Sequence, residues 1–267
     1  MKKIYLHQFL SKTGLFESKV ELIRAIRKGE IKIDDRPVIN PFFQFRPGKK
    51  IVYWKGQPVK EVEGFIYIIL NKPEGYLSSR ITEMDKKLGK KSMFDLIEKD
   101  KKLDEITKKT LFSVGRLDED TSGLILITND GKFCTKMTNP KHEIPKKYRV
   151  VLEKPLAKEL IAKIEKGITI ELEENGRITK YKTKACKINM MPGSDKELTL
   201  TLFEGKKREA RRIFQAVGNK VIKLQRIAIG NLQLKEFGLK EGEFVFKDRK
   251  FIEERVFRKI FKPPFKN

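Results

Sequence analysis

The stretch from residue 115 to residue 130 limits the possible folds of this chain more than any other part of the sequence. It reads GRLDEDTSGLILITND, an acid-rich loop followed at once by a short apolar run. The run from Leu124 to Ile127 is too short for a helix, and Asn129 and Asp130 close it as turn residues close a strand. The sequence therefore predicts a strand in the interior of a sheet, with a polar loop in front of it.

The loop in front of the predicted strand can carry chemistry. Gly115 and Gly123 are conformationally free and bracket Arg116, Asp118 and Asp120, so the chain can present carboxylates beside a cation at the edge of a sheet. The acids imitate the first half of a calcium-binding loop, but the twelfth position holds an Asn where such a loop needs a bidentate Glu. Calcium is therefore excluded. From these residues alone, an ordinary acidic surface turn remains the alternative.

Composition indicates a polyanionic partner. The chain has 267 residues, enough for one full domain and a small one, and a formal net charge of +24. Such a chain gains affinity for nucleic acid by releasing counterions. No apolar run approaches the roughly 18 residues of a membrane span, and no signal peptide follows Met1, so we expect a cytoplasmic protein that does not contact membranes. The cysteines and histidines are isolated in the sequence, so no metal site is expected.

Three motifs resemble those of a known family. GRLDEDTSGLILITNDG is similar to the signature GRLD-x-x-T-x-GLLLLTNDG of the bacterial ribosomal RNA pseudouridine synthases of the RsuA/RluB type. In that family the Asp of GRLD is catalytic, a role that falls on Asp118. The family's K-x-Y motif, whose Tyr stacks on the target base, falls on Lys146 and Tyr148. EGKKREARRIFQAVG resembles EG-x-x-x-QVRRM-x-x-x-G, whose first paired Arg, here Arg211, forms an ion pair with the catalytic Asp.

One position departs from the family's pattern. Glu209 stands where the family usually has Gln, and its carboxylate is expected to pair with Arg208 or Arg212. Ahead of the central loop, FIYIILNKPEG resembles the family's Y-x-x-x-NKP-x-G motif. The residues that follow it, Ser78-Ser79-Arg80, are expected to form a loop that faces nucleic acid.

The first 60 residues resemble the αL RNA-binding motif of a primary rRNA-binding protein of the small ribosomal subunit. Apolar residues at helical spacing predict a helix from Tyr5 to Leu10, and a capping-box sequence starting at Ser18 begins a second helix. GEIKIDDRPVINP matches the family's strand and turn, with Asp34-Asp35-Arg36 in place of Asn-Gly. The resemblance implies that one basic face lies against RNA, made of Lys19, Arg24, Arg27 and Lys28 and joined by Lys12.

The order of the elements predicts an α+β fold, because strands cluster around turns too tight for helical crossovers. We expect a small RNA-binding domain at 1–60, followed by a polar linker at about 55–64. A larger catalytic domain at 64–250 is expected to have a mostly antiparallel sheet flanked by helices, with a basic tail at 251–267. The lysine-rich segment 99–109 is expected to be an exposed excursion.

The resemblance implies site-specific isomerisation of uridine to pseudouridine in ribosomal RNA or a partly assembled ribosomal subunit, by a monomer and without a cofactor. Asp118 would act at the anomeric carbon of a flipped-out nucleotide, as a nucleophile or as the base of a glycal route, and Arg211 would lower its pKa. Two other classes remain open: a non-catalytic ribosome-assembly factor, and a magnesium-dependent nuclease that uses Asp118, Glu119 and Asp120. The expected RNA-binding residues are Lys12, Lys19, Arg24, Arg27, Lys28, Arg80, Arg116, Lys146, Arg208 and Arg212.

Overall fold

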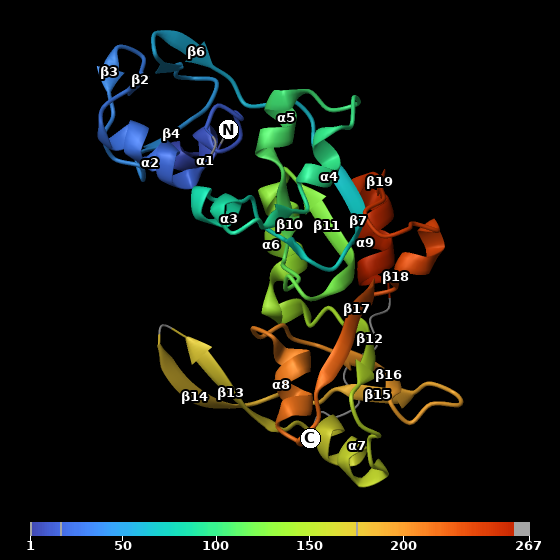
Figure 1. The fold of residues 1–267 in the computed structure, drawn as a ribbon. Helices are drawn as coiled ribbons and strands as arrows, with labels where there is room; N and C mark the ends of the chain where they lie inside the picture. Colours follow the sequence, from blue (N-terminus) through green and yellow to red (C-terminus); the bar gives the residue numbers. More distant parts are fainter. Residues whose placement is uncertain (1, 17, 175, 259–267) are drawn as a thin grey trace. The chain divides into compact units, whose positions relative to one another are not determined.

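The chain divides into two compact units (Figure 1). A computed structural model describes residues 2–16, 18–174 and 176–258. The N-terminal unit comprises residues 1–65 and 97–112, and the large unit comprises residues 66–96 and 113–267. Among the helices in the described ranges, none combines the length and the apolar composition that a membrane crossing requires.

The N-terminal unit is built from short helices and hairpins around an apolar core. Both helices that the sequence predicts in it are confirmed. The Ser18 side chain accepts a hydrogen bond from the Glu21 backbone N–H at the start of the second helix, and Gly29, with a φ of 72°, follows its end. The elements are β1 (Ile4–Tyr5), α1 (Leu6–Leu10), α2 (Lys19–Arg27), β2 (Ile31–Ile33), β3 (Arg36–Pro37), β4 (Gln44–Phe45), β5 (Val52–Trp54), β6 (Gln57–Val59) and α5 (Glu105–Thr110).

The turn between β2 and β3 tolerates an acid in place of the usual Asn. Asp34 adopts a φ of 52°, in the left-handed region that Asn and Asp enter more readily than most residues. Its carboxylate accepts hydrogen bonds from the Lys50 ammonium at 2.6 Å and the Ile51 backbone N–H at 3.1 Å. These contacts bind the turn to the neighbouring strand.

The structure corrects one prediction about the N-terminal unit and refines another. Lys55 and Gly56 form the turn between β5 and β6, so residues 57–59 are a paired strand rather than part of a linker. The lysine-rich segment 99–109 is largely exposed, as predicted, but α5 begins within it and Lys108 is buried. The Lys108 ammonium donates to the Glu98 carbonyl at 2.6 Å, which satisfies the buried cation.

The large unit contains a nine-stranded, mostly antiparallel sheet flanked by helices, as the α+β prediction requires. Its main path runs β15-β16-β12-β17-β11-β7-β19, with β10 paired to β11 and β18 to β17; β11 and β17 are parallel. The sheet strands are β7 (Tyr67–Lys72), β10 (Phe112–Val114), β11 (Ser122–Thr128), β12 (Lys146–Leu152), β15 (Lys187–Met190), β16 (Glu197–Leu202), β17 (Val221–Ile229), β18 (Leu232–Gln233) and β19 (Phe244–Phe246).

Helices and smaller strand pairs complete the unit. The helices α6, α7 and α8 form where the sequence places apolar residues at helical spacing. The bounds are β8 (Tyr76–Leu77), α3 (Glu83–Lys87), β9 (Lys91–Ser92), α4 (Asp95–Glu98), α6 (Gly131–Thr138), η1 (Pro140–His142), α7 (Lys158–Glu165), β13 (Thr169–Glu174), β14 (Arg177–Lys182), α8 (Glu209–Gln215), η2 (Leu234–Phe237) and α9 (Arg249–Phe257).

The strand predicted from the central motif is confirmed as β11, and all of its residues are buried. Gly123 near its start has a φ of 105°, and a Cβ placed there would lie 2.3 Å from the Arg226 carbonyl oxygen. Only glycine therefore allows β17 to approach this closely. The glycine fixes the distance between the acid loop and its neighbouring strand.

The prediction of a basic tail from residue 251 is wrong for residues 251–257. These residues belong to α9, whose Ile252 and Val256 are fully buried against Phe133 and Leu232 in the core of the large unit. The two apolar residues are four apart and share one face, so the helix can bury them and still expose its charges. Residues 259–267 lie outside the described residues.

Candidate active site

The register of three adjacent strands brings the acid loop and the K-x-Y tyrosine together. Tyr148 on β12 is paired with Arg226 on β17, and Arg226 is paired with Gly123 on β11. Gly123 lies five residues after Asp118 in the sequence. Two motifs that are distant in sequence therefore meet in one part of the sheet.

Two arginines at the start of α8 hold the acid loop through Asp120. Arg208 donates to both carboxylate oxygens of Asp120, at 3.1 and 2.8 Å. Arg211 donates to the Asp120 carbonyl oxygen at 2.5 Å, and its Nε lies 3.2 Å from the carboxylate. Burial raises the pKa of Asp120, but the hydrogen bonds from Arg208 and the charge of Arg211 outweigh it and lower the pKa overall. The loop is thus fixed by charge-assisted contacts.

The predicted ion pair between Arg211 and Asp118 is wrong. The Arg211 guanidinium is directed at Asp120 and at the Val221 carbonyl, to which it donates at 2.8 Å. Among the described ion pairs, the cation near Asp118 is Arg208, with its Nη1 3.9 Å from the carboxylate. The Asp118 side chain is 36% exposed. The Asp118 carboxylate is therefore accessible to a substrate.

Residues that precede the acid loop in the sequence also hold it in place. The Ser78 hydroxyl donates to the Leu117 carbonyl at 2.7 Å and accepts from the Leu117 N–H at 3.0 Å. Glu119 accepts hydrogen bonds from the Lys90 ammonium at 2.7 Å, and its carbonyl accepts the Gly75 N–H at 2.8 Å. Ser78, expected in a loop facing nucleic acid, is buried and supports the acid loop instead.

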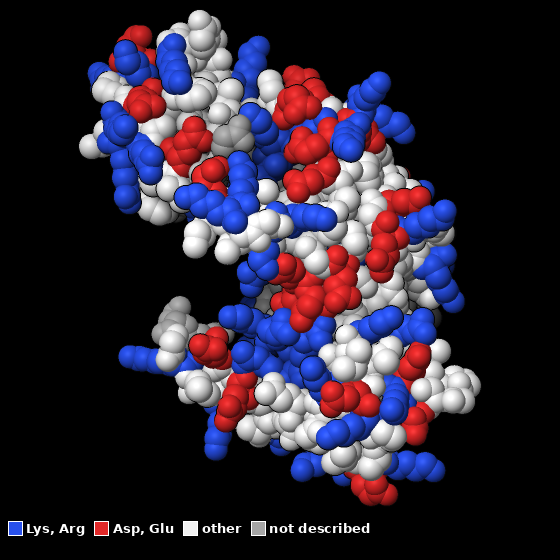
Figure 2. Space-filling model, viewed as in Figure 1, with Lys and Arg blue, Asp and Glu red and all other residues white. Residues whose placement is uncertain are grey.

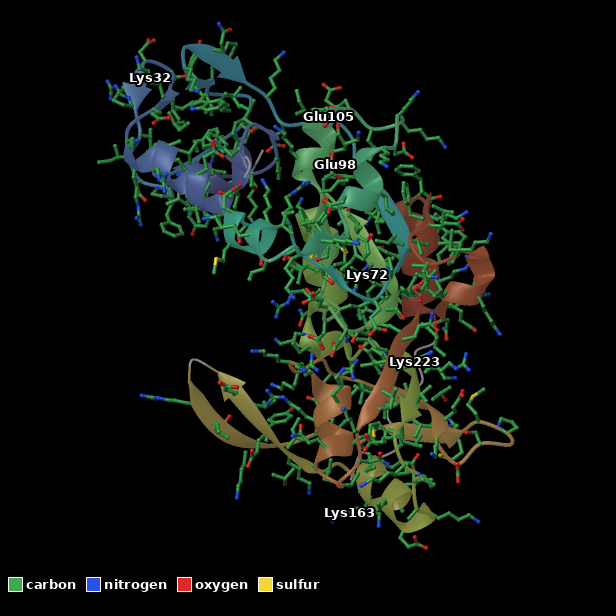
Figure 3. All side chains as sticks on the ribbon, in the orientation of Figure 1. Lys32, Lys72, Glu98, Glu105, Lys163 and Lys223 are labelled. Carbon is green, nitrogen blue, oxygen red and sulfur yellow. The ribbon has the colours of Figure 1, made fainter. Side chains whose placement is uncertain are left out.

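A buried lysine at the end of β7, labelled in Figure 3, was missed by the sequence reasoning. The Lys72 ammonium donates to the carbonyls of Pro73 and Tyr76, at 2.9 and 2.7 Å. Burial lowers its pKa to about 8, although the charges of Asp120 and Glu119 oppose the shift. Lys72 lies at the end of a largely apolar strand, and this position in the sequence could have indicated that the lysine is buried.

Tyr148 lies against a buried arginine. The ring of Tyr148 is half-buried, and its hydroxyl interacts with the Arg226 guanidinium. Burial raises the pKa of Tyr148, and the Arg226 charge opposes that shift. Arg226 is 2% exposed and donates through Nε to the Leu124 carbonyl at 2.7 Å. Sequence reasoning missed Arg226, although it lies two residues after Leu224 on the same buried strand face.

A buried carboxyl group and a partly buried ammonium group lie near this tyrosine. Burial raises the pKa of Glu209 to about 8, and its carboxyl accepts the Lys206 backbone N–H at 2.8 Å. The Lys146 ammonium lies 3.4 Å from the carbonyls of Ile144 and Glu204, and burial lowers its pKa to about 8. The pKa values of both groups are therefore shifted towards neutral pH.

The expected pairing of Glu209 with Arg208 or Arg212 is wrong. Arg208 pairs with Asp120, and Arg212 donates to the Glu171 carbonyl on β13. Arg212 thus contacts the β13–β14 hairpin, although the sequence predicts a role in RNA binding. Glu209 turns inward because its backbone lies at the first position of α8, after Arg208, which has a φ of 55°.

The remaining cations predicted to bind RNA lie at several places. In the N-terminal unit, four of them are exposed on α2 and line a shallow concavity with Val20 and Ile23: Lys19, Arg24, Arg27 and Lys28. Lys12 lies 3.1 Å from the Glu61 carboxylate. In the large unit, Arg116 is exposed and the Arg80 guanidinium lies 4.7 Å above the Phe94 ring.

Charged side chains of both signs border one another on one face of the large unit (Figure 2). A cavity of about 800 Å³ lies elsewhere, lined by Lys147, Thr201 and Gln225 among others. These residues alternate along their strands with Tyr148, Leu200 and Arg226, so the cavity and the acid loop belong to opposite faces of the sheet. Within the described ranges, no three His, Cys, Asp or Glu side chains gather as a group that could hold a metal ion.

Comparison with known proteins identifies the class to which this fold and site belong. A model of the family described as RNA pseudouridylate synthase matches residues 66–216. The chain is 34% identical over 251 residues to an uncharacterized RNA pseudouridine synthase of Aquifex aeolicus, covering 94% of each chain. It is 32% identical over 233 residues to the ribosomal small subunit pseudouridine synthase A of Escherichia coli, covering 87% of this chain and 90% of that one.

A solved structure agrees with these relatives. The crystal structure of a pseudouridylate synthase is similar with a TM-score of 0.64 and 30% sequence identity, over 95% of this chain and 100% of that chain. The chain belongs to the RNA pseudouridine synthase family.

Proposed function

We propose that the protein converts a specific uridine of small-subunit ribosomal RNA into pseudouridine. The observation that carries the proposal is the strand register, which aligns Tyr148, Arg226 and the start of β11 beside the acid loop. The names of similar proteins in Escherichia coli and Vibrio vulnificus, both ribosomal small subunit pseudouridine synthase A, support the substrate class.

Asp118 is the proposed catalytic residue. Its partly exposed carboxylate lies in a loop that other side chains hold in place. The reaction breaks the bond between N1 of uracil and C1′ of the ribose, turns the base, and joins C5 to C1′; C5 loses a proton and N1 gains one. An ionised carboxylate can assist either by attack at C1′ or by removal of the C2′ proton. The net change is an isomerisation, so no oxidant or group donor is consumed.

Tyr148 is the proposed stacking residue. A target nucleotide in folded RNA must be flipped out, which costs a few kcal/mol in lost stacking and pairing. Stacking of the extruded base on a tyrosine ring contributes roughly 1–3 kcal/mol and offsets part of this cost. Arg226 beneath the hydroxyl would keep the ring in one orientation.

Arg208 and Arg211 are proposed as positioning residues. Their contacts run to Asp120, two residues beyond Asp118, so they set the direction of the loop rather than binding the reacting carboxylate directly. Arg208 also supplies positive charge 3.9 Å from Asp118, which favours its ionised form.

The N-terminal unit is proposed as an αL RNA-binding domain. Its support is the cluster of exposed cations on α2, Lys19, Arg24, Arg27 and Lys28, in a chain with a net charge of +24. One chain supplies Asp118, Tyr148 and Arg211, so we propose an active monomer. It would act in the cytoplasm, where bacteria assemble ribosomal subunits.

The test is to incubate protein-free small-subunit and large-subunit ribosomal RNA with the protein and a metal chelator, then map pseudouridine by mass spectrometry. The proposal predicts one new pseudouridine in small-subunit RNA, with RNA length unchanged. Partly assembled small subunits serve as a second substrate. Absence of product in every substrate, with RNA binding retained, would favour the assembly-factor alternative. Chelator-sensitive shortening of the RNA would favour a nuclease.

A further inference from the structure

The N-terminal unit has an aromatic cluster on its surface, apart from the cations on α2. Tyr5 on β1, His7 on α1 and Phe42 in the loop before β4 are in mutual ring contact, with centroids 5.2 to 6.0 Å apart. The planes of Tyr5 and His7 are within 16° of parallel, and the Phe42 ring is nearly perpendicular to both. We call this group the aromatic platform.

The platform is open to solvent. Phe42 is 65% exposed and Tyr5 is 36% exposed, whereas most aromatic rings of a small domain contribute to its core. The neighbouring core ring, Phe9, is buried against Phe45. The unit therefore already has an aromatic core, and the platform is additional to it. An exposed aromatic group of this kind usually marks an interaction surface.

The backbone holds the platform in place. The strand pair β1–β4 sets Tyr5 opposite Gln44, and the Leu6 N–H bonds to the Phe43 carbonyl at 2.8 Å. His7 is fixed by a 2.9 Å hydrogen bond between its Nδ1 and the Pro41 carbonyl. The rings are thus carried by elements joined through backbone contacts. Such a surface would lose little freedom on binding a ligand.

Exposed cations near Tyr5 fit a nucleic-acid strand. Lys3 and Arg46 each lie one residue beyond the Ile4–Phe45 pair of β1 and β4, both are exposed, and Lys3 is two residues from Tyr5. Cations beside exposed rings are the combination that binds single-stranded RNA, because bases stack on the rings and the phosphates need neutralising charge. An apolar protein partner would not need those cations.

We propose that the aromatic platform binds unpaired nucleobases of the RNA that the enzyme modifies. The platform acts in addition to the exposed cations of α2, which would contact phosphates of any strand. This inference rests on the proposed function of the N-terminal unit in RNA binding. It adds that the unit distinguishes single-stranded from duplex RNA, by stacking rather than by base-edge hydrogen bonds.

The test measures the affinity of the full chain for an oligouridine of about ten nucleotides, a length typical of single-strand sites, and for an RNA duplex of equal length. The variants are the double replacements Tyr5→Leu/Phe42→Leu, which keep apolar volume and remove the rings, and Arg24→Ala/Arg27→Ala. Phe43→Ala is the matched control, because Phe43 is 39% exposed in the same loop but is outside the platform. Thermal unfolding of each variant verifies that the unit is folded.

The proposal predicts about tenfold weaker binding of oligouridine by the leucine variant, unchanged duplex binding and an unchanged salt slope. Arg24→Ala/Arg27→Ala should weaken the binding of both RNAs and reduce the dependence of the affinity on salt. Phe43→Ala should behave as wild type. Ultraviolet crosslinking of oligouridine should place label on the peptide that contains Tyr5 or Phe42.

Two results would overturn the inference. One is wild-type affinity of a folded leucine variant for oligouridine, with crosslinks confined to other peptides. The other is failure of the wild type to bind oligouridine while it still binds the duplex. In both cases the arginine variant reports separately on RNA binding by the unit, and pseudouridine mapping reports on catalysis. The proposed function can therefore stand while this inference fails.

Discussion

At the scale of single residues, the two aspartates of the acid loop have different roles. Asp120 accepts the hydrogen bonds from Arg208 and Arg211, whereas the Asp118 carboxylate lies 3.9 Å from Arg208 Nη1 and is 36% exposed. The family resemblance assigns the contact with Arg211 to Asp118. Backbone geometry decides otherwise, because Arg211 reaches the Asp120 carbonyl and carboxylate at once.

Arg211→Lys tests the positioning role. Lysine cannot contact the Asp120 carbonyl, the Asp120 carboxylate and the Val221 carbonyl together, so the loop should lose its orientation. We expect kcat to fall about 10- to 100-fold with little change in the Kd for RNA. Arg212→Lys is the control, because Arg212 contacts the hairpin at Glu171. Single-turnover kinetics and binding measurements give the two quantities. Equal losses of kcat in Arg211→Lys and Arg212→Lys would contradict the positioning role of Arg211.

Glu209→Gln tests the buried carboxyl. Its pKa is raised from 4.5 to about 8, so the folded state keeps a proton that the unfolded chain releases. The stability of the wild type should therefore fall as pH rises through this window. Glutamine does not titrate, and the variant should gain on the order of 1–3 kcal/mol relative to wild type between about pH 5 and pH 9. Urea unfolding across this pH range measures the difference in the free energy of unfolding between the variant and the wild type. Parallel pH profiles would show that Glu209 does not titrate as described.

At the scale of elements, β11 and α8 were predictable and α9 was not. A short apolar run closed by turn residues leaves few alternatives to a buried strand, and the apolar spacing in α8 predicts a helix. In α9, Ile252 and Val256 are separated by charged residues, so the local composition resembles a tail. Contacts with distant parts of the chain, such as Phe133, decide that this segment is a helix in the core.

Lys55 and Gly56 illustrate the same limit at a turn. A polar stretch with Gly and Pro is typical both of a linker and of a tight hairpin. The pairing of Val52 with Val59 across the sheet decides between them, and that partner is not visible in the local pattern. Buried cations were missed for a related reason, since Lys72 and Arg226 depend on carbonyls supplied by the folded backbone.

Gly123→Ala tests the close approach of β11 and β17. The new methyl group would lie 2.3 Å from the Arg226 carbonyl oxygen at a φ of 105°, so the strands must separate. We expect a loss of about 2–5 kcal/mol in the free energy of unfolding. Gly131→Ala is the control, because no atom lies within 4 Å of its added Cβ at the start of α6. Denaturant unfolding measures both, and an undiminished stability of Gly123→Ala would refute the packing argument.

At the scale of the whole molecule, the net charge of +24 should act through RNA affinity rather than through chemistry. Arg24→Ala/Arg27→Ala should raise the Kd for ribosomal RNA and flatten its dependence on salt, while kcat at saturating RNA stays near wild type. Lys163→Ala/Lys166→Ala removes two exposed lysines from the α7 region as a charge-matched control. Filter binding over a salt series tests this. Equal effects of both pairs would mean that charge acts without regard to position.

The fold class and the functional class follow from long motifs, whereas the detailed contacts do not. GRLDEDTSGLILITNDG predicts both a strand and a family, because many positions are specified at once. The partners of Arg211, Arg212 and Glu209 depend on where the β13–β14 hairpin and the acid loop lie around α8. No spacing within the helix encodes those positions.

The most direct test of the central claim compares Asp118→Asn with Asp120→Asn in pseudouridine formation on the modified ribosomal RNA, at equal RNA occupancy. Both variants remove one carboxylate charge from the same loop. We predict that Asp118→Asn lowers the rate by about 10³-fold or more, to the level of the blank, while Asp120→Asn retains measurable activity, about tenfold reduced. An active Asp118→Asn beside an inactive Asp120→Asn would contradict it and assign the chemistry to Asp120.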